Sequence, residues 1–238
     1  MVPPIKFVKL ALFFVILQSQ SGKIMKKVNP IEALIAQGEH QQLDFKFEVS
    51  DSKKIARTLS AFANTDGGRL LIGVKDNGNI AGVRSEEEYY MIEAASDMYT
   101  KPSVPFTATR WDINGKTVLE IYIAPSDKKP HTAPDKDNKY KAYIRVDDEN
   151  ILANEVLLLA WKKSERTDGL LLPLSRPVKK LLLYLETHPY INIRQFCRIA
   201  HINYYAARNI LSDLMAINTL KYTIVDKQIV YSIEKIIR

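Results

Sequence analysis

The dipeptide Asn114-Gly115 stands between two stretches, 106–113 and 116–124, that we expect to form strands. Asn-Gly favours a type I′ turn because both residues tolerate a positive φ, and this turn joins two antiparallel strands in a fixed register. The stretch 140–146 is also rich in strand-forming residues. The chain must therefore fold around a sheet that is at least partly antiparallel.

Strands and helices are interleaved along the chain up to about residue 166. Strict alternation over 43–47 predicts a half-buried strand, with Asp44 and Lys46 on its solvent face. Turn residues, capping residues and apolar spacing predict further strands at 69–74 and 80–83, and helices that begin at 29, 51, 85 and 154. This mixture indicates a domain of the α+β class.

A different pattern occupies the end of the chain. Apolar spacing predicts three helices, and alternation predicts two strands after them, at 177–187, 193–199, 204–216, 220–225 and 228–233. Three helices and a β-hairpin within about sixty residues form the layout of a winged helix-turn-helix domain. We therefore expect an extension at 1–24, a first domain at 25–166, a linker at 167–175 and a second domain at 176–238.

Residues 9–17 form an apolar run with basic flanks, which is typical of the core of a signal peptide. The run is too short to span a bilayer as a helix, and Met25 offers an alternative start directly before the first domain. We expect a start-site artefact or an upstream extension rather than export, and no membrane partner. A single cysteine, Cys197, excludes a disulfide framework and favours the cytoplasm.

Positive charge is concentrated at the end of the chain. Residues 176–238 contain ten Lys or Arg and four Asp or Glu, a net charge of +6, whereas residues 25–175 have a net charge of −2. A small basic domain beside a nearly neutral one is typical of proteins that bind the phosphate backbone of nucleic acids. The alternative is a solvated basic surface with no specific partner.

Three stretches, 39–46, 60–68 and 71–78, resemble the motifs of the AlbA_2 family, which is also called Schlafen AlbA_2 or divergent AAA-4. They contain Glu39 and Lys46 in the first motif, Ala-Phe-Ala-Asn-Thr-Asp-Gly-Gly in the second, and Gly-Val-Lys-Asp-Asn-Gly in the third. Residues 143–146 resemble the closing strand of the family. The resemblance implies an α/β domain that binds nucleic acid and occurs in bacterial transcriptional regulators.

Some Schlafen relatives are metal-dependent RNA endonucleases that use three acids of the first and third motifs. Carried over by position, the resemblance implies Glu39, Asp44 and Asp76 as ligands of Mg²⁺ or Mn²⁺, with Lys46 stabilising phosphate charge. The family generally has Glu where this chain has Asp44, which shortens the side chain by one methylene. Structural alternatives are a solvated strand face with a cross-strand ion pair and a turn that requires Asp76.

The divergent AAA name suggests ATP, but the chain contains no Gly-x-x-x-x-Gly-Lys-Ser/Thr motif, so no ATP site of that kind is predicted. The glycines at 67 and 68 are better explained by a sharp turn between a helix and a strand. No cofactor is therefore expected apart from the metal ion of a nuclease. Schlafen nucleases pair two lobes around RNA, so this chain, with one lobe, is expected to form a homodimer.

The stretch 204–216 is the expected recognition helix of the second domain. Its inward face is predicted to contain Ala207, Ile210, Leu211 and Leu214, and its exposed half Tyr204, Tyr205, Arg208 and Asn209. Arg and Asn side chains are suited to bidentate contacts with guanine and adenine, and Lys221 and Lys227 on the predicted hairpin are suited to phosphates. The alternative is a dimer interface with the tyrosines as anchors.

Two functions follow from the sequence. The first is a DNA-binding transcriptional regulator without catalytic activity, and the second is a metal-dependent ribonuclease that cleaves structured RNA such as tRNA. A third, protein-interaction module would show no affinity for nucleic acid.

Overall fold

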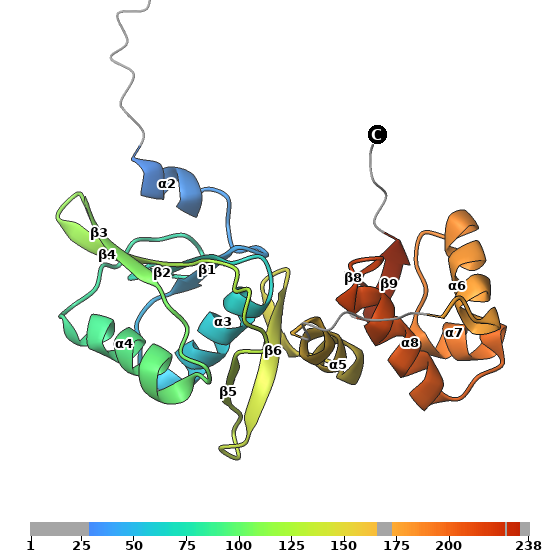
Figure 1. Ribbon diagram of the computed structural model, residues 1–238. Helices are drawn as coiled ribbons and strands as arrows, with labels where there is room; N and C mark the ends of the chain where they lie inside the picture. Colours follow the sequence, from blue (N-terminus) through green and yellow to red (C-terminus); the bar gives the residue numbers. More distant parts are fainter. Residues whose placement is uncertain (1–28, 166–172, 227, 234–238) are drawn as a thin grey trace, which may run out of the picture. The chain divides into compact units, whose positions relative to one another are not determined.

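The computed structural model describes residues 29–165, 173–226 and 228–233 (Figure 1). The expectations for residues 1–24 and for most of the linker lie outside these ranges. Helix α2 (Pro30–Ile35) begins where predicted, since the Asn29 side chain accepts a hydrogen bond from the Ile31 N–H at 3.1 Å. In the described part of the chain, no helix combines the length and the apolar character needed to cross a membrane.

A four-stranded mixed sheet forms the centre of the first domain, in the order β1-β2-β4-β3. Its strands are β1 (Leu43–Lys46), β2 (Gly68–Ile72), β3 (Thr107–Ile113) and β4 (Lys116–Ile123). Strands β1 and β2 are parallel, and the other pairs are antiparallel. The predicted β3–β4 hairpin is confirmed, because Asn114 and Gly115 both have a positive φ, 54° and 76°.

Two helices, α3 (Ser52–Asn64) and α4 (Glu87–Tyr99), lie side by side against this sheet (Figure 1). Helix α3 begins at Asp51, whose carboxylate accepts from the Lys53 N–H at 2.8 Å. Its buried residues include Leu59 and Phe62, which pack with Ile72 and Ile121 of the sheet. Helix α3 is therefore the central element of the first core.

The other side of α3 contacts a second, three-stranded antiparallel sheet, in the order β5-β6-β7. Its strands are β5 (Thr132–Pro134), β6 (Tyr140–Val146) and β7 (Glu149–Leu152). Strand β6 coincides with the strand predicted from the sequence. Arg145, near its C-terminal end, contacts Asp44 on β1.

One predicted strand is wrong. The return segment at 80–83 forms a single bridge, between Val74 and Ile80, rather than a paired strand. Gly73 and Gly82 have φ of 90° and 84°, and the N–H groups of Ala81 and Gly82 both donate to the Gly73 carbonyl. A positive φ interrupts the extended backbone that a strand requires.

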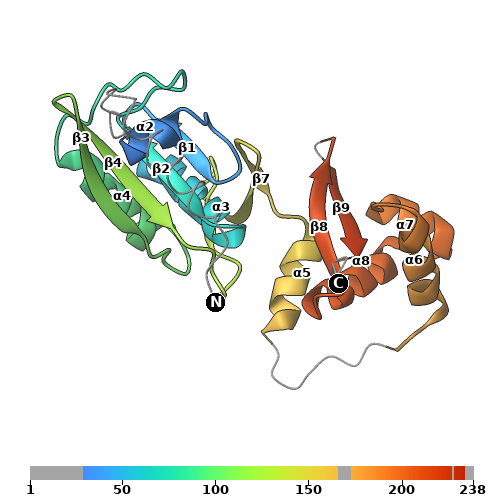
Figure 2. The same cartoon turned by 90° about the horizontal axis from the view of Figure 1, so that it is seen from above.

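The remaining elements gather around a second core. They are α5 (Glu155–Ser164), α6 (Arg176–Thr187), α7 (Ile193–Ala200), α8 (Tyr204–Ala216), β8 (Leu220–Val225) and β9 (Gln228–Ile233). The three helices and the hairpin predicted for this region are all present. Helix α5 packs against α8, and its Val156 belongs to the second core (Figure 2).

Candidate functional site

A buried ion pair links the first motif to the closing strand of the domain. Asp44 on β1 is 3% exposed and Arg145 on β6 is 2% exposed. Arg145 Nη2 donates to Asp44 Oδ1 at 3.0 Å. On the other oxygen, Lys46 Nζ lies 2.7 Å from Asp44 Oδ2, an ion pair whose angles are not those of a hydrogen bond. Asp44 and Lys46 do lie side by side, as predicted, but the predicted solvent exposure of Asp44 is wrong because Arg145 covers it.

Arg145 is the main site residue that the sequence analysis missed. Its Nη1 donates to Asn150 Oδ1 at 3.2 Å, and its guanidinium lies 5.2 Å from the centre of the Phe62 ring. Asn150 in turn donates to Thr58 Oγ1 at 2.9 Å, which ties β7 to α3. The sequence did contain an indication of this role. Arg145 stands between Ile144 and Val146 at the apolar end of a predicted strand, where burying an unpaired charge would cost free energy.

Glu39 lies beside this pair. Its Oε1 accepts a hydrogen bond from the Phe45 N–H at 2.8 Å, which holds the residue against β1. Burial raises the pKa of the Glu39 carboxyl, and a hydrogen bond and negative charge from Asp44 raise it further. The first motif therefore brings two of the three predicted acids together, with Glu39 holding its proton more tightly than an exposed carboxyl does.

Asp76 lies elsewhere, on an exposed turn closed by the Lys75 N–H, which donates to the Asn79 carbonyl at 3.0 Å. Within the described ranges, no group of three or more His, Cys, Asp or Glu is arranged to hold a metal ion. Both carboxylate oxygens of Asp44 already face cations. The geometry as it stands does not fit a divalent ion at Asp44, and the role of Glu39, Asp44 and Asp76 as ligands stays a prediction.

The second motif holds the sheet that carries Arg145. Asn64, at the end of α3, donates to the carbonyls of His131 and Tyr143, each at 2.8 Å, and accepts from the His131 N–H at 2.8 Å. Thr65 Oγ1 accepts from the Arg145 N–H at 2.9 Å and donates to the Ala61 carbonyl at 2.7 Å. The second motif thus has a structural function, because Asn64 and Thr65 hold β6 next to α3.

Gly67 and Gly68 are required by close packing at the turn between α3 and β2. A Cβ on Gly67, whose φ is +69°, would lie 2.6 Å from the Ile123 carbonyl oxygen. A Cβ on Gly68 would lie 2.5 Å from the Phe62 ring. These contacts explain the two glycines without any bound phosphate.

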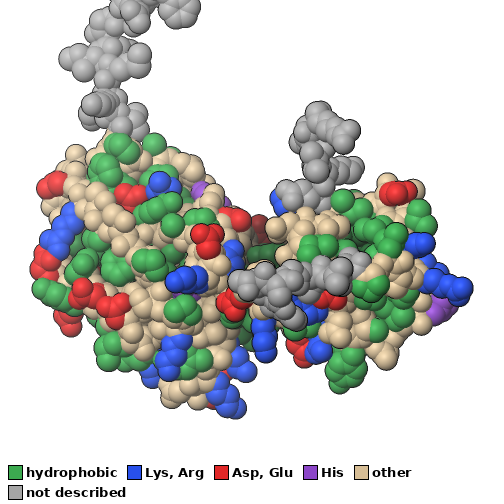
Figure 3. All heavy atoms as spheres, viewed as in Figure 1, with side chains coloured by type: hydrophobic (Ala, Val, Ile, Leu, Met, Phe, Trp, Pro, Cys, Tyr) green, Lys and Arg blue, Asp and Glu red, His purple; other side chains and the backbone are tan. Residues whose placement is uncertain are grey.

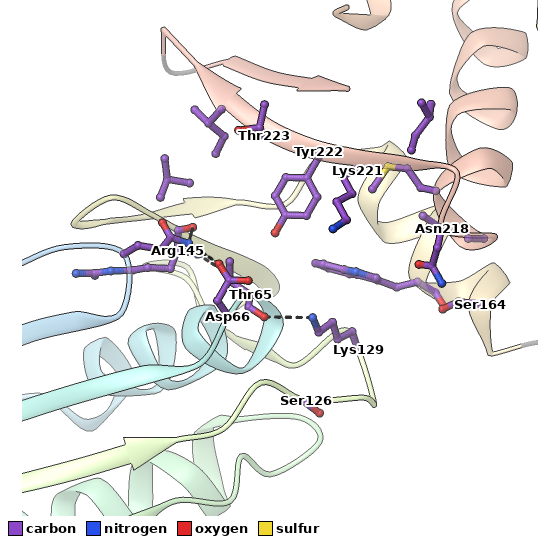
Figure 4. Close-up of a pocket in the computed structure, with 18 of the residues that line it drawn as sticks. Thr65, Asp66, Ser126, Lys129, Arg145, Ser164, Asn218, Lys221, Tyr222 and Thr223 are labelled. Carbon is purple, nitrogen blue, oxygen red and sulfur yellow. Dashed lines mark hydrogen bonds between the residues drawn. The ribbon is translucent and has the colours of Figure 1, made fainter. Parts of the chain in front are cut away.

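A further buried group, His131, lies behind the second motif. Its Nδ1 is 2.9 Å from the Pro102 carbonyl, which can only accept, so Nδ1 carries the proton and Nε2 accepts from Ser126 Oγ at 2.8 Å. Burial lowers the pKa of His131. Burial also lowers the pKa of Lys129, which with Thr65, Asp66 and Arg145 lines one side of the pocket in Figure 4.

Helix α8 has the predicted faces. Ala207, Leu211 and Leu214 are buried, Ile210 is half-buried, and Tyr204, Tyr205 and Asn209 are exposed. Arg208 differs from the prediction, because its Nη1 donates to Glu155 Oε2 of α5 at 3.1 Å. Lys221 is exposed on β8, and Lys227 lies outside the described residues.

Residues 39–154 match the family model "Schlafen, AlbA_2". Among solved structures, the chain is similar to the DIP2311 protein of Corynebacterium diphtheriae, with 20% identity and a TM-score of 0.41, over 59% of this chain and 28% of that one. It is also similar to the N-terminal domain of a protein of Nitrosomonas europaea whose name relates it to the ATP-dependent DNA helicase RecG. That similarity has 22% identity and a TM-score of 0.34, over 52% of this chain and 87% of that one.

No match was found among curated proteins. The chain spans little more than a quarter of the Corynebacterium protein. Similarities this distant carry no activity over to this chain.

Proposed function

Because residues 39–154 belong to the Schlafen AlbA_2 family, we propose that this protein binds nucleic acid and acts as a DNA-binding transcriptional regulator. In this proposal residues 176–233 form a winged helix with α8 as the recognition helix. The supporting observation is the connection between α7 and α8. Three residues, 201–203, join the two helices, and His201 has a φ of 55°. A turn of three to four residues between two helices is typical of the helix-turn-helix motif.

The surface of α8 suits this role. Asn203 caps the helix by accepting from the Ala206 N–H at 2.9 Å, so the N-terminal half that reaches base edges in such domains is well formed. Tyr204, Tyr205 and Asn209 are exposed on it. The β8–β9 hairpin follows directly and provides the wing, with Lys221 on it.

The distribution of charge along the chain also supports a role of the C-terminal domain in binding nucleic acid. The net charge of +6 at 176–238 contrasts with −2 at 25–175. On the face shown in Figure 3, acidic and basic side chains are intermixed. We propose that the C-terminal domain supplies most of the phosphate contacts and that the AlbA_2 domain supports assembly, as a homodimer in the reducing cytoplasm.

The test is a binding and cleavage assay on one preparation of residues 25–238. The protein is incubated with random-sequence duplex DNA and with a tRNA pool, each with and without Mn²⁺. Salt-sensitive retention of duplex DNA, with tRNA left intact, is the expected result. A protein that retains neither nucleic acid at low salt would contradict the proposal.

A second candidate is a metal-dependent ribonuclease. The observation that favours it is the adjacency of Glu39 and Asp44, with the pKa of Glu39 raised by burial, since perturbed carboxyls are common at catalytic sites. It would require Lys46 or Arg145 to leave Asp44. Fragments of tRNA that form only with Mn²⁺, and that Asp76→Asn and Glu39→Gln both abolish, would establish this function.

A further inference from the structure

Helix α5 packs against α8 and also contacts β9. At its start, Asn154 Nδ2 donates to the hydroxyl of Tyr231 on β9 at 2.9 Å, and Val156 is buried in the second core. Near its end, Lys163 Nζ lies 2.6 Å from Asp213 Oδ1 and 2.8 Å from Ser212 Oγ, both on α8. Figures 1 and 2 both show the two helices side by side. Thus α5 covers one flank of the proposed recognition helix.

The contact between the two helices includes Arg208, the residue of α8 best suited to recognise a base. Glu155 Oε2 accepts from Arg208 Nη1 at 3.1 Å. Arg208 Nε is buried and has no hydrogen-bond partner among the described residues. The guanidinium also lies 5.4 Å from the centre of the Tyr205 ring.

A guanidinium can donate two parallel hydrogen bonds to a base edge from either of two pairs of nitrogens, Nη1 with Nη2 or Nε with Nη2. In this structure Glu155 occupies Nη1, and Nε is buried. Neither edge of Arg208 is therefore free for a bidentate contact while the side chain stays on Glu155.

We propose that Glu155 competes with nucleic acid for Arg208, so that helix α5 sets the affinity of α8 for DNA. Glu155 is a positioning residue in this scheme, since it acts on the ligand through Arg208. The pair is accessible to solvent, with side-chain exposures of 27% for Arg208 and 60% for Glu155, so a phosphate or a guanine can displace it. The inference rests on the proposed function of α8.

The experiment measures binding of the full chain to fluorescein-labelled random-sequence duplex DNA by fluorescence anisotropy. Glu155→Gln keeps the shape of the side chain and removes its charge. An exposed ion pair is worth roughly 0.2–1 kcal/mol, so the affinity is expected to rise about 1.4- to 5-fold. The matched control is Glu165→Gln, which removes the same charge at the exposed other end of α5.

A double-mutant cycle separates competition for Arg208 from a general charge effect. In an Arg208→Ala background, Glu155→Gln is expected to change the affinity no more than Glu165→Gln does. Equal gains from both glutamine variants in the native background, or a gain that persists without Arg208, would overturn the inference. A loss of affinity in Glu155→Gln would also overturn it, because it would mean that Glu155 presents Arg208 rather than withholding it.

The same data distinguish this failure from failure of the proposed function. If the native chain does not bind the duplex at low salt, the proposed function fails and the inference fails with it. If Arg208→Ala binds the duplex as well as the native chain, the protein still binds DNA, and only the role of Arg208, and with it the competition, is wrong. If Arg208→Ala loses affinity while the two glutamine variants match, α8 keeps its role and only the competition is wrong. Equal melting temperatures of the variants would show that each one is folded.

Discussion

Asp44 and Arg145 each place a full charge inside the protein, and neither is stable there alone. The contacts of Arg145 with Asp44, Asn150 and the Phe62 ring replace part of the water that it loses, while its Nε is buried without a hydrogen-bond partner among the described residues. A buried pair of this kind often adds little net stability, yet breaking it on one side is costly.

Removing one partner should therefore destabilise the protein more than removing both. Asp44→Ala is expected to lower the free energy of unfolding by about 3–5 kcal/mol, because it leaves Arg145 buried without its carboxylate. Asp44→Ala combined with Arg145→Met should recover a large part of this loss. Urea unfolding followed by circular dichroism measures both variants. A double variant less stable than the single one would contradict this expectation, because it would mean that Arg145 stabilises the fold through contacts other than that with Asp44.

His131 predicts a pH dependence at the same scale. Burial holds its pKa below the ordinary value of 6.5, so the unfolded chain binds the proton more readily than the folded one. The contribution of neutral His131 to the free energy of unfolding should then be fully present above about pH 6.5 and should be lost as the pH falls below that value. His131→Gln is expected to flatten this dependence between about pH 5 and 7. Thermal melting of both proteins across that range tests it, because the other histidines are the same in each.

At the scale of elements, the connection from α3 to β2 is the most constrained part of the first domain. At the start of this connection, Asn64 and Thr65 form hydrogen bonds with the backbone of β6. Two residues later, Gly67 packs closely against the end of β4. Three elements thus meet at a turn of a few residues.

Two glycine variants measure how tightly this turn is packed. Gly115→Ala introduces a side chain at a φ of +76° with no atom within 4 Å, so only the backbone strain of about 1–2 kcal/mol is expected. Gly67→Ala has similar strain and also a contact of 2.6 Å with the Ile123 carbonyl, which should cost a further 1–3 kcal/mol or so. Equal losses in chemical denaturation would show that the turn shifts to accommodate the methyl group.

Elements that depend on local signals were predictable from the sequence. The hairpin at Asn114-Gly115 and the helices capped by Asn29, Asp51 and Asn154 all form where their residues indicate. The sequence did not show that Asp44 is buried, because alternation identifies the two faces of a strand without saying what covers each one. The contact between Arg208 and Glu155 was missed for the same reason, since it joins two helices 53 positions apart.

At the scale of the molecule, the uneven charge predicts how nucleic-acid binding responds to salt. If residues 176–238 supply the phosphate contacts, the logarithm of the association constant should fall linearly with the logarithm of salt concentration, by about 0.9 for each phosphate contacted. Lys179→Gln together with Lys180→Gln in α6 should reduce the slope if these side chains contact phosphates. Lys53→Gln together with Lys54→Gln in α3 is the matched control in the first domain. Anisotropy titrations at several KCl concentrations give the slopes, and an affinity independent of salt would exclude backbone binding.

The pairing of Asp44 with Arg145 also has a consequence for synthesis. The two residues are 101 positions apart, so a ribosome that adds about 5–20 residues per second makes Asp44 about 5–20 s before its partner. During that interval β1 and β2 can pair, but Asp44 on β1 lacks the guanidinium that neutralises it in the folded domain. Completion of the domain must therefore wait until the strand that carries Arg145 has left the exit tunnel of the ribosome.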